Sequence, residues 1–310
     1  MRMLTAAAAA AALAVLGGCD WVDPSEWGQS QRYREPFSAT EKLPAGARVS
    51  LETFNGKIEL FGWDREEASI EAVKYASREE IVHQMDVDVV ADAGSLRVRV
   101  RRPETNCNCG ASLTVRLPRR VIVEEARTSN GAVTLESLEG SGKATTSNGG
   151  IRAWDVAGDW TLRTSNGAVE LDRVSGSFFA RSSNGRIRVS ALRGKADVET
   201  TNGAIDAEIR EPAQGAPLSF RSSNGSITLK FDRWAQNPLR VVTSNASITL
   251  ALPDGVNARI RAVTSNGRIT SDFEVAAREW GKHRLEGRLG AGGEEMDLST
   301  SNGNIRLVRR

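Results

Sequence analysis

The sequence is poor in aromatic residues, in histidine and in net charge. Aromatic side chains make up 5% of the 310 residues, there are two histidines, and the formal net charge is +2. A charge so close to zero argues against a nucleic-acid partner, which needs a basic surface. Few aromatics combined with 29 glycines favour thin stacked strands over a thick mixed core.

The chain also lacks an apolar run long enough to cross a membrane. Its most apolar stretch, Leu4–Val15, follows Arg2 and ends in Leu16-Gly17-Gly18-Cys19. This pattern is typical of a signal peptide, whereas a transmembrane helix needs about 20 apolar residues. Residues 16–19 resemble the lipobox of bacterial lipoproteins. The resemblance implies cleavage after residue 18 and acylation of Cys19 by chains such as palmitate, which would anchor the protein.

A lipid-anchored chain would lie in the bacterial cell envelope, facing the periplasm or the surface. Asp20 follows the cysteine, and in enterobacterial lipoproteins this residue favours the inner membrane, but the choice between inner and outer membrane stays open. Residues 19–46 are polar and contain Pro24, Pro36 and Pro44, so we interpret them as the lipidated cysteine and a tether. Four aromatic residues in the tether could pack locally or on the bilayer: Trp21, Trp27, Tyr33 and Phe37.

One short motif, Thr-Ser-Asn-Gly, recurs along the chain. Five copies are 18 residues apart, and related copies occur at wider intervals. The ten asparagines are Asn55, Asn130, Asn148, Asn166, Asn184, Asn202, Asn224, Asn245, Asn266 and Asn302. A fixed period near 20 residues is the signature of a solenoid.

The residues around each asparagine alternate in polarity. Counted from the asparagine as zero, position −4 is apolar, −2 is Thr or Ser, and +3 is Val or Ile in every copy. Period-two alternation predicts half-buried strands on both sides of a turn. We therefore expect an all-β fold, a β-solenoid resembling a β-helix with rungs of about 18–22 residues. In this interpretation positions −4, −2 and the asparagine point inward.

Stacked rungs would place each asparagine about 4.8 Å from the next. An amide has two donor hydrogens and an acceptor oxygen, so the ten asparagines are expected to form a structural ladder. Glycine follows the asparagine in nine of the ten copies, which predicts a positive φ at the turn. Ala246 stands there in the remaining copy and would be strained.

The spacing divides the mature chain into two regions. Residues 47–126 contain strand-like runs at 68–76, 86–90, 95–102 and 112–123, which predict an N-terminal region of longer strands that starts the stack. Residues 127–310 form the repeat solenoid. The last interval between asparagines is 36 residues, so one rung is expected to be degenerate or looped out around residues 276–293.

The chain resembles the bacterial "putative adhesin" domain of unknown function. The resemblance begins at Phe54-Asn55-Gly56-Lys57-Ile58, continues through Val115-Arg116-Leu117-Pro118 and the Ser-Asn-Gly copies, and ends near Ile305. It covers about residues 47–310. It implies a β-solenoid at the cell envelope, and it carries over no catalytic residue.

The residue types that support catalysis or metal binding are scarce. His83 and His283 lie in no recognisable motif, and no repeat carries the Asp-rich glycine loop of calcium-binding β-rolls. Cys107 and Cys109 suggest a local disulfide in an exported protein, with free thiols or a metal or redox role as alternatives. Glu170 and Asp172 would lie on one side of a strand about 7 Å apart, as a carboxylate pair or a salt-bridged surface. No metal and no cofactor is predicted.

Position −3 carries arginine in four copies: Arg127, Arg163, Arg181 and Arg221. We call these residues the Arg column. Arginines on adjacent rungs repel each other unless an anion or an acidic side chain lies between them, so a phosphate, a uronate or a lipid headgroup could bind there. The side chain of Glu199 could instead lie between two arginines and neutralise them.

The sequence therefore favours a non-catalytic, lipid-anchored envelope solenoid that presents a binding or scaffolding surface. The partners expected are the membrane through its anchor, and an anionic glycan, a lipid headgroup or an envelope protein. The alternatives are an envelope carbohydrate-active enzyme on a β-helix scaffold, and a stress or assembly factor that acts through a protein partner.

Overall fold

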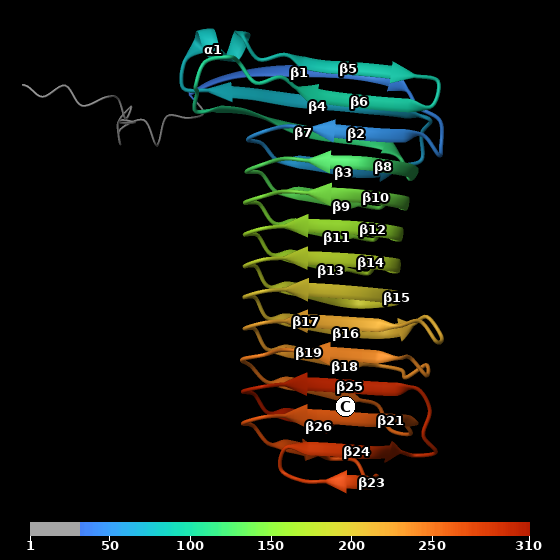
Figure 1. Cartoon of the computed structure of the whole chain (residues 1–310). Helices are drawn as coiled ribbons and strands as arrows, with labels where there is room; N and C mark the ends of the chain where they lie inside the picture. Colours follow the sequence, from blue (N-terminus) through green and yellow to red (C-terminus); the bar gives the residue numbers. More distant parts are fainter. Residues whose placement is uncertain (1–31) are drawn as a thin grey trace, which may run out of the picture.

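The computed structural model describes residues 32–310, which form a straight stack of β-strands (Figure 1). The expectations for the signal peptide, for Cys19, and for Trp21 and Trp27 lie outside the described residues. Within the described part there are 26 strands and one short helix, α1 (Glu79–His83). That helix is too short to cross a membrane. The predicted β-solenoid is confirmed.

Each rung contributes one strand to each of two facing sheets. In stacking order, sheet I contains β1 (Tyr33–Lys42), β4 (Glu67–Ala76), β7 (Cys109–Pro118), β3 (Ile58–Trp63), β9 (Val133–Glu136), β11 (Ile151–Trp154), β13 (Val169–Asp172), the first part of β15 (Ile187–Thr200), β16 (Ile205–Pro212), β18 (Ile227–Phe231), β20 (Ile248–Leu252), β26 (Ile305–Arg309) and β22 (Ile269–Ser271). Sheet II contains β5 (Val87–Asp92), β6 (Ser95–Val100), β2 (Arg48–Glu52), β8 (Arg120–Arg127), β10 (Glu139–Thr145), β12 (Ala157–Thr164), β14 (Ser175–Ser182), the second part of β15, β17 (Leu218–Ser222), β19 (Leu239–Val242), β25 (Glu295–Thr300), β21 (Ala258–Thr264), β24 (Arg284–Leu289) and β23 (Val275–Trp280). Because β15 continues around a corner, the two sheets are joined.

The core lies between the two sheets. It consists of columns of apolar side chains, one column for each inward-facing position of the rung. The β-branched residues at +3 and the residues at −4 are buried along the whole stack. Trp160, Phe178 and Phe220 are the large side chains that fill the middle of sheet II. Because like residues lie over like in parallel register, each rung buries its neighbours and no rung could stand alone.

The hydroxyl at position −2 joins each rung to the next. All ten Thr and Ser side chains at this position are buried. Each donates a hydrogen bond to a backbone carbonyl of an adjacent rung; Thr164, for example, donates to the carbonyl of Gly149 over 2.8 Å. The same oxygen accepts the backbone N–H of Gly167 in its own rung, over 3.2 Å. The repeated spacing of the hydroxyl residue and Gly within the motif therefore satisfies two backbone groups in eight of the ten rungs, and the carbonyl alone in the rungs of Asn55 and Asn245.

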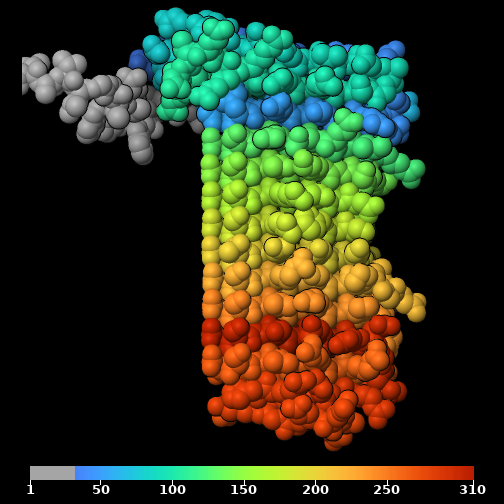
Figure 2. Space-filling view, viewed as in Figure 1, coloured from blue at the N-terminus to red at the C-terminus, as the bar shows by residue number. Residues whose placement is uncertain are grey.

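The asparagines do not point inward, which corrects the expected orientation. Asn148, Asn166 and Asn184 are exposed, and they lie on the narrow edge where sheet II turns into sheet I. That edge is the straight column of atoms at the left of Figure 2. The chain turns directly after the buried threonine rather than after the asparagine, so positions −1 to +2 face outward or lie along the corner.

The glycine at +1 is required by close packing and not by a positive φ, so that expectation was wrong. A Cβ on Gly167 would lie 1.9 Å from the carbonyl oxygen of Gly149 in the adjacent rung. Neither Gly167 nor Ala246 has a positive φ, so Ala246 lacks the predicted strain. Positive φ values occur instead at the opposite corner, where Gly158 (109°) follows Asp155 (53°).

The C-terminal part of the predicted tether, residues 19–46, belongs to the fold, which corrects its boundary. Residues 33–42 form β1, which pairs antiparallel with β4 over ten residues. Tyr33, Phe37 and Ala39 alternate inward along this strand, and Phe37 packs against the core. The period-two alternation in residues 33–41 was the overlooked signal.

The remaining N-terminal strands start the stack, although the run at 112–123 is two strands rather than one. A corner near Arg119 separates β7 in sheet I from β8 in sheet II. Helix α1 closes the upper end over a small cluster that contains Ile81, Met85 and Cys109.

The C-terminal rung is inserted into the stack instead of ending it. Strand β25 lies between β19 and β21, and β26 lies between β20 and β22. The chain first builds the rung of Asn266, then forms the antiparallel β23–β24 hairpin, and then returns to fill the gap next to the rung of Asn245. Residues 276–293 are therefore mainly this terminal hairpin, seen at the bottom of Figure 1.

Candidate functional site

The exposed asparagines form a continuous chain of amide hydrogen bonds. Each Nδ2 donates to the Oδ1 of the adjacent rung, over 2.6 to 2.8 Å in eight links. Asn130 donates in the same way to Asn55. Asn266 bonds to Asn302 and Asn302 to Asn245, so the order of the amides follows the stack and not the sequence. With both groups of each link satisfied, the edge is a structural feature that leaves one N–H per amide facing solvent.

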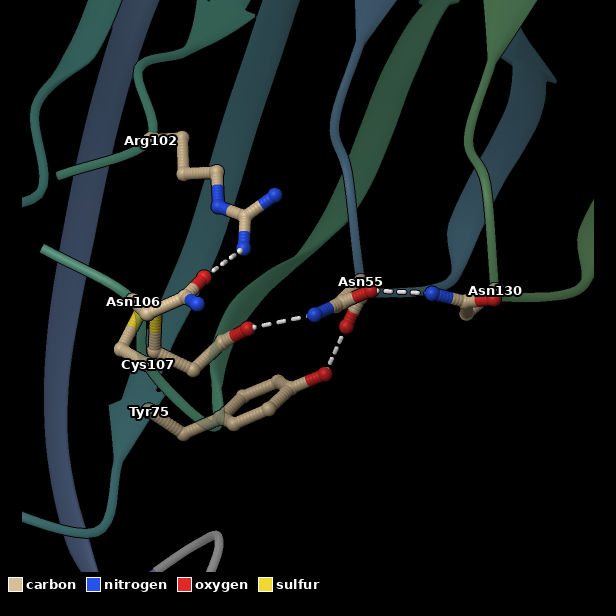
Figure 3. Close-up of a disulfide and its surroundings, with 7 residues drawn as sticks. Asn55, Tyr75, Arg102, Asn106, Cys107 and Asn130 are labelled. Atoms are coloured by element: carbon tan, nitrogen blue, oxygen red, sulfur yellow. Dashed lines mark hydrogen bonds between the residues drawn. A yellow bond between two sulfur atoms is a disulfide. The ribbon is translucent and has the colours of Figure 1, made fainter. Parts of the chain in front are cut away.

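The amide chain ends at the predicted disulfide (Figure 3). Asn55 donates to the backbone carbonyl of Cys109 over 2.9 Å. Cys107 and Cys109 are joined by a disulfide. The Tyr75 hydroxyl donates to the backbone carbonyl of Asn55, and burial raises the pKa of Tyr75 above its ordinary value. The disulfide thus holds the loop that closes the upper end of the amide chain.

The structure places His83 in a cluster with two other charged groups. His83 Nδ1 lies 2.9 Å from one carboxylate oxygen of Glu35, and Lys74 Nζ lies 2.8 Å from the other. Lys74 is 8% exposed and also donates to the carbonyl of Met85. The hydrogen bond from Lys74 holds the pKa of Glu35 below its ordinary value. This cluster ties β1 to β4 and to the segment after α1. His283 lies apart from it, in the turn of the terminal hairpin.

The Arg column lies on the outer face of sheet II, and acidic side chains neutralise part of it. Arg163 and Arg181 are in register on adjacent rungs. Glu199 occupies the same position on the next rung and bonds to Arg181 over 2.5 Å and to Arg221 over 3.4 Å. Arg163 and Arg181 both stack on the ring of Phe179, at 5.3 and 4.8 Å from its centroid.

At the other end of the Arg column, the acidic residue in register with Arg127 is Glu52 on β2, which is paired with Arg99 over 3.2 Å. Thr145 lies between Arg127 and Arg163 on the intervening rung. Its Oγ1 is buried and has no hydrogen-bond partner within residues 32–310, and the same holds for Nε of Arg181. Arg127 and Arg163 take part in no ion pair with any described residue. The guanidinium groups of Arg127 and Arg163 are therefore not neutralised by an acidic side chain of the described residues.

The two carboxylates considered as a catalytic pair are engaged in ion pairs. Glu170 accepts from Arg152 over 3.0 Å, and Asp172 pairs with Arg173 over 3.1 Å. Arg173 also forms a bidentate contact with Asp155 and stacks at 4.6 Å on the half-exposed ring of Trp154. These contacts fit the alternative of a salt-bridged surface, in which charges alternate along the outer face of sheet I.

A hollow at the C-terminal end was not anticipated from the sequence. It has a volume of about 760 Å³ and lies where β21, β23, β24 and β25 meet. Arg259, Arg278 and Arg288 line it, with Ala276 and Gly287 among its small residues. Alternation in residues 258–264 could have placed Arg259 outward, but the strand opposite it lay in a segment expected to be looped out. No group of three or more potential metal-ligating side chains occurs in residues 32–310.

No family model matches the chain, and no curated protein matches it. The solved structures that the chain matches include a "putative adhesin" from Parabacteroides distasonis (8% identity, TM-score 0.40) and another from Bacteroides fragilis (10% identity, TM-score 0.38). Each comparison covers 88% of this chain and 97% of the other. A "putative cell adhesion protein" from Clostridium sporogenes has 10% identity and a TM-score of 0.23, over 89% of this chain and 100% of that one.

Proposed function

We propose that this chain is a non-catalytic, lipid-anchored β-solenoid of the bacterial cell envelope whose outer sheet faces present a binding surface for anionic partners. The observation that carries the proposal is the combination of the lipobox-like residues 16–19 with a fold whose first described strand, β1, lies at one end of a straight stack. An anchor at Cys19 would therefore attach beside the upper end.

The stack would then extend away from the membrane. Ten asparagine rungs at about 4.8 Å per rung span roughly 43 Å, without the terminal strands. The sheet faces along this length are exposed and repetitive, which suits an extended partner that makes the same contact on successive rungs. This arrangement favours a scaffolding or adhesive role over a reaction at one point.

The stretch of the Arg column around Thr145 is the most suitable part of sheet II for an anionic group. Arg127 and Arg163 form no ion pair within residues 32–310, since Glu52, in register with Arg127, is paired with Arg99, and Thr145 lies between the two arginines. A phosphate or carboxylate of a glycan, a headgroup or a protein would satisfy these donors through charge-assisted hydrogen bonds.

The test of the anchor is the Cys19→Ser variant, followed by membrane fractionation and metabolic labelling with a palmitate analogue. We expect release into the soluble fraction and loss of label, because the acyl chains supply most of the membrane affinity. The matched control is Cys107→Ser, which should stay labelled and membrane-bound. A Cys19→Ser protein that remains in the membrane fraction would overturn the lipoprotein proposal.

A further inference from the structure

The hollow at the C-terminal end contains two directly opposed arginines that no acidic side chain of the described residues neutralises. In the antiparallel pairing of β21 with β24, Arg259 lies directly opposite Arg288. Side chains in this position have Cβ atoms about 5 Å apart, and like charges there are destabilising. Neither guanidinium forms an ion pair with any residue from 32 to 310, and the same is true of Arg278 on β23.

In the neighbouring row of the same strands, the arginines are paired with acidic side chains. Two residues further along, Arg261 lies between Glu286 of β24 and Asp297 of β25, at 3.7 and 3.8 Å. Arg284 is likewise paired with Glu279 and Glu286. Glu286, which lines the hollow, is thus already engaged with Arg261 and Arg284. Glu295 lies beside Arg259 in register but is not within ion-pair distance of it.

The shape of the surface leaves room for a ligand next to these arginines. Small residues form part of the lining, namely Ala276, Ala277 and Gly287, and a Cβ on Gly287 would lie 2.7 Å from Val275 Cγ1. The volume of about 760 Å³ lies within the range of small-molecule sites, roughly 300–1,000 Å³. A guanidinium group presents a planar fork of donors that matches phosphate and carboxylate oxygens.

We infer that this hollow is a second binding site, for a ligand that carries closely spaced acidic groups, such as the phosphates of a diphosphate or the carboxylates of a uronate oligosaccharide. Arg259 and Arg288 hold one acidic group between them, and Arg278 contacts it or its neighbour from β23. The ligand removes the repulsion between the two opposed arginines. The site is separate from the Arg column, and it does not depend on the lipid anchor.

Isothermal titration of the purified full-length chain in detergent tests the inference, with inorganic pyrophosphate and with trigalacturonate as probes at low ionic strength. We expect one probe per chain in the hollow, in addition to any that the Arg column binds, and affinity that falls as salt is added. The double variant Arg259→Gln with Arg288→Gln should weaken binding about ten-fold or more, because two charge-assisted contacts are lost. The probe that binds more tightly identifies the source of the acidic group.

The matched control is the double variant Arg97→Gln with Arg306→Gln, which makes the same change of charge at exposed arginines outside both the hollow and the Arg column. It should bind the probe as the wild type does. Without ligand, the Arg259/Arg288 variant should melt at the same temperature as the wild type or higher, since a repulsion is removed. The inference is overturned if neither probe binds the wild type, if the control variant loses binding instead, or if the hollow variant melts lower because the arginines are structural.

Discussion

At the scale of single residues, the threonine and the asparagine of one motif contribute differently to stability. Thr164 is buried and satisfies the carbonyl of Gly149 and the N–H of Gly167. Asn166 is exposed and bonds to its neighbours through groups that water could satisfy instead. An unpaired buried polar group costs about 1–3 kcal/mol, whereas a solvated hydrogen bond contributes about 1 kcal/mol or less.

We therefore expect Thr164→Val to lower the free energy of unfolding by about 2–3 kcal/mol and Asn166→Ala by about 1 kcal/mol or less. Ser165→Ala, at the exposed position between them, is the control and should be near neutral. Urea denaturation of the three variants measures the difference. A larger loss for Asn166→Ala than for Thr164→Val would mean that the amide chain, and not the hydroxyl column, holds the rungs together.

At the scale of secondary-structure elements, β1 is the strand whose attachment depends most visibly on charge. Glu35 projects from β1 between Lys74 of β4 and His83 of α1. The hydrogen bond from Lys74 lowers the pKa of Glu35 from its ordinary value of 4.5. A carboxyl group with a lowered folded-state pKa contributes stability that is present above the unfolded-state value and is lost as the pH falls through the folded-state value.

Glu35→Gln should therefore destabilise β1 at neutral pH, by up to about 1 kcal/mol for a partly exposed pair. The difference from wild type should shrink as the pH falls below 4.5 and the wild-type carboxyl becomes protonated. Hydrogen exchange of the β1 amides at neutral and acidic pH measures both effects. Glu41→Gln, on the same strand without an ion pair to a described residue, is the control. A difference that grows on acidification would contradict the proposed role of Glu35.

At the scale of the whole molecule, the order of rungs differs from the order of the chain. The last segment, residues 294–310, fills an internal gap between the rungs of Asn245 and Asn266. Its side chains Met296, Leu298, Ile305 and Leu307 are buried there. The end of the stack is instead covered by the β23–β24 hairpin, whose antiparallel pairing and exposed charges prevent further rungs from adding.

Deletion of residues 294–310 should therefore open the stack internally. We expect a loss on the order of 5–10 kcal/mol, since four large apolar side chains lose their burial. Amides of β19–β22 should lose protection against hydrogen exchange, whereas β9–β14 should keep theirs, because solenoid rungs interact mainly with their neighbours. If β21 remains protected in the truncated chain, the inserted rung is not needed to hold the C-terminal end.

The sequence by itself determined the rung. The period of 18 residues, the buried hydroxyl at −2 and the β-branched residue at +3 are local and repeat, so a strand, a corner and an inward face could be predicted for each copy. The same repetition made the asparagines a column, because parallel rungs align like positions. The side of the corner on which Asn166 lies was predicted wrongly, because a bend of three residues can begin before or after the asparagine with the same alternation.

Tertiary structure alone decided how the rungs are ordered and closed. Insertion of β25 and β26 depends on pairing between segments that are far apart in the sequence. Because the repeats have similar sequences, nothing local specifies which repeat pairs with which. The alternation in residues 33–41 could have indicated a strand, but the pairing of β1 with β4, like the hollow beside Arg259 and Arg288, could not be anticipated. Opposed arginines become a candidate site only when two strands are placed side by side, and no local pattern in either strand specifies its partner.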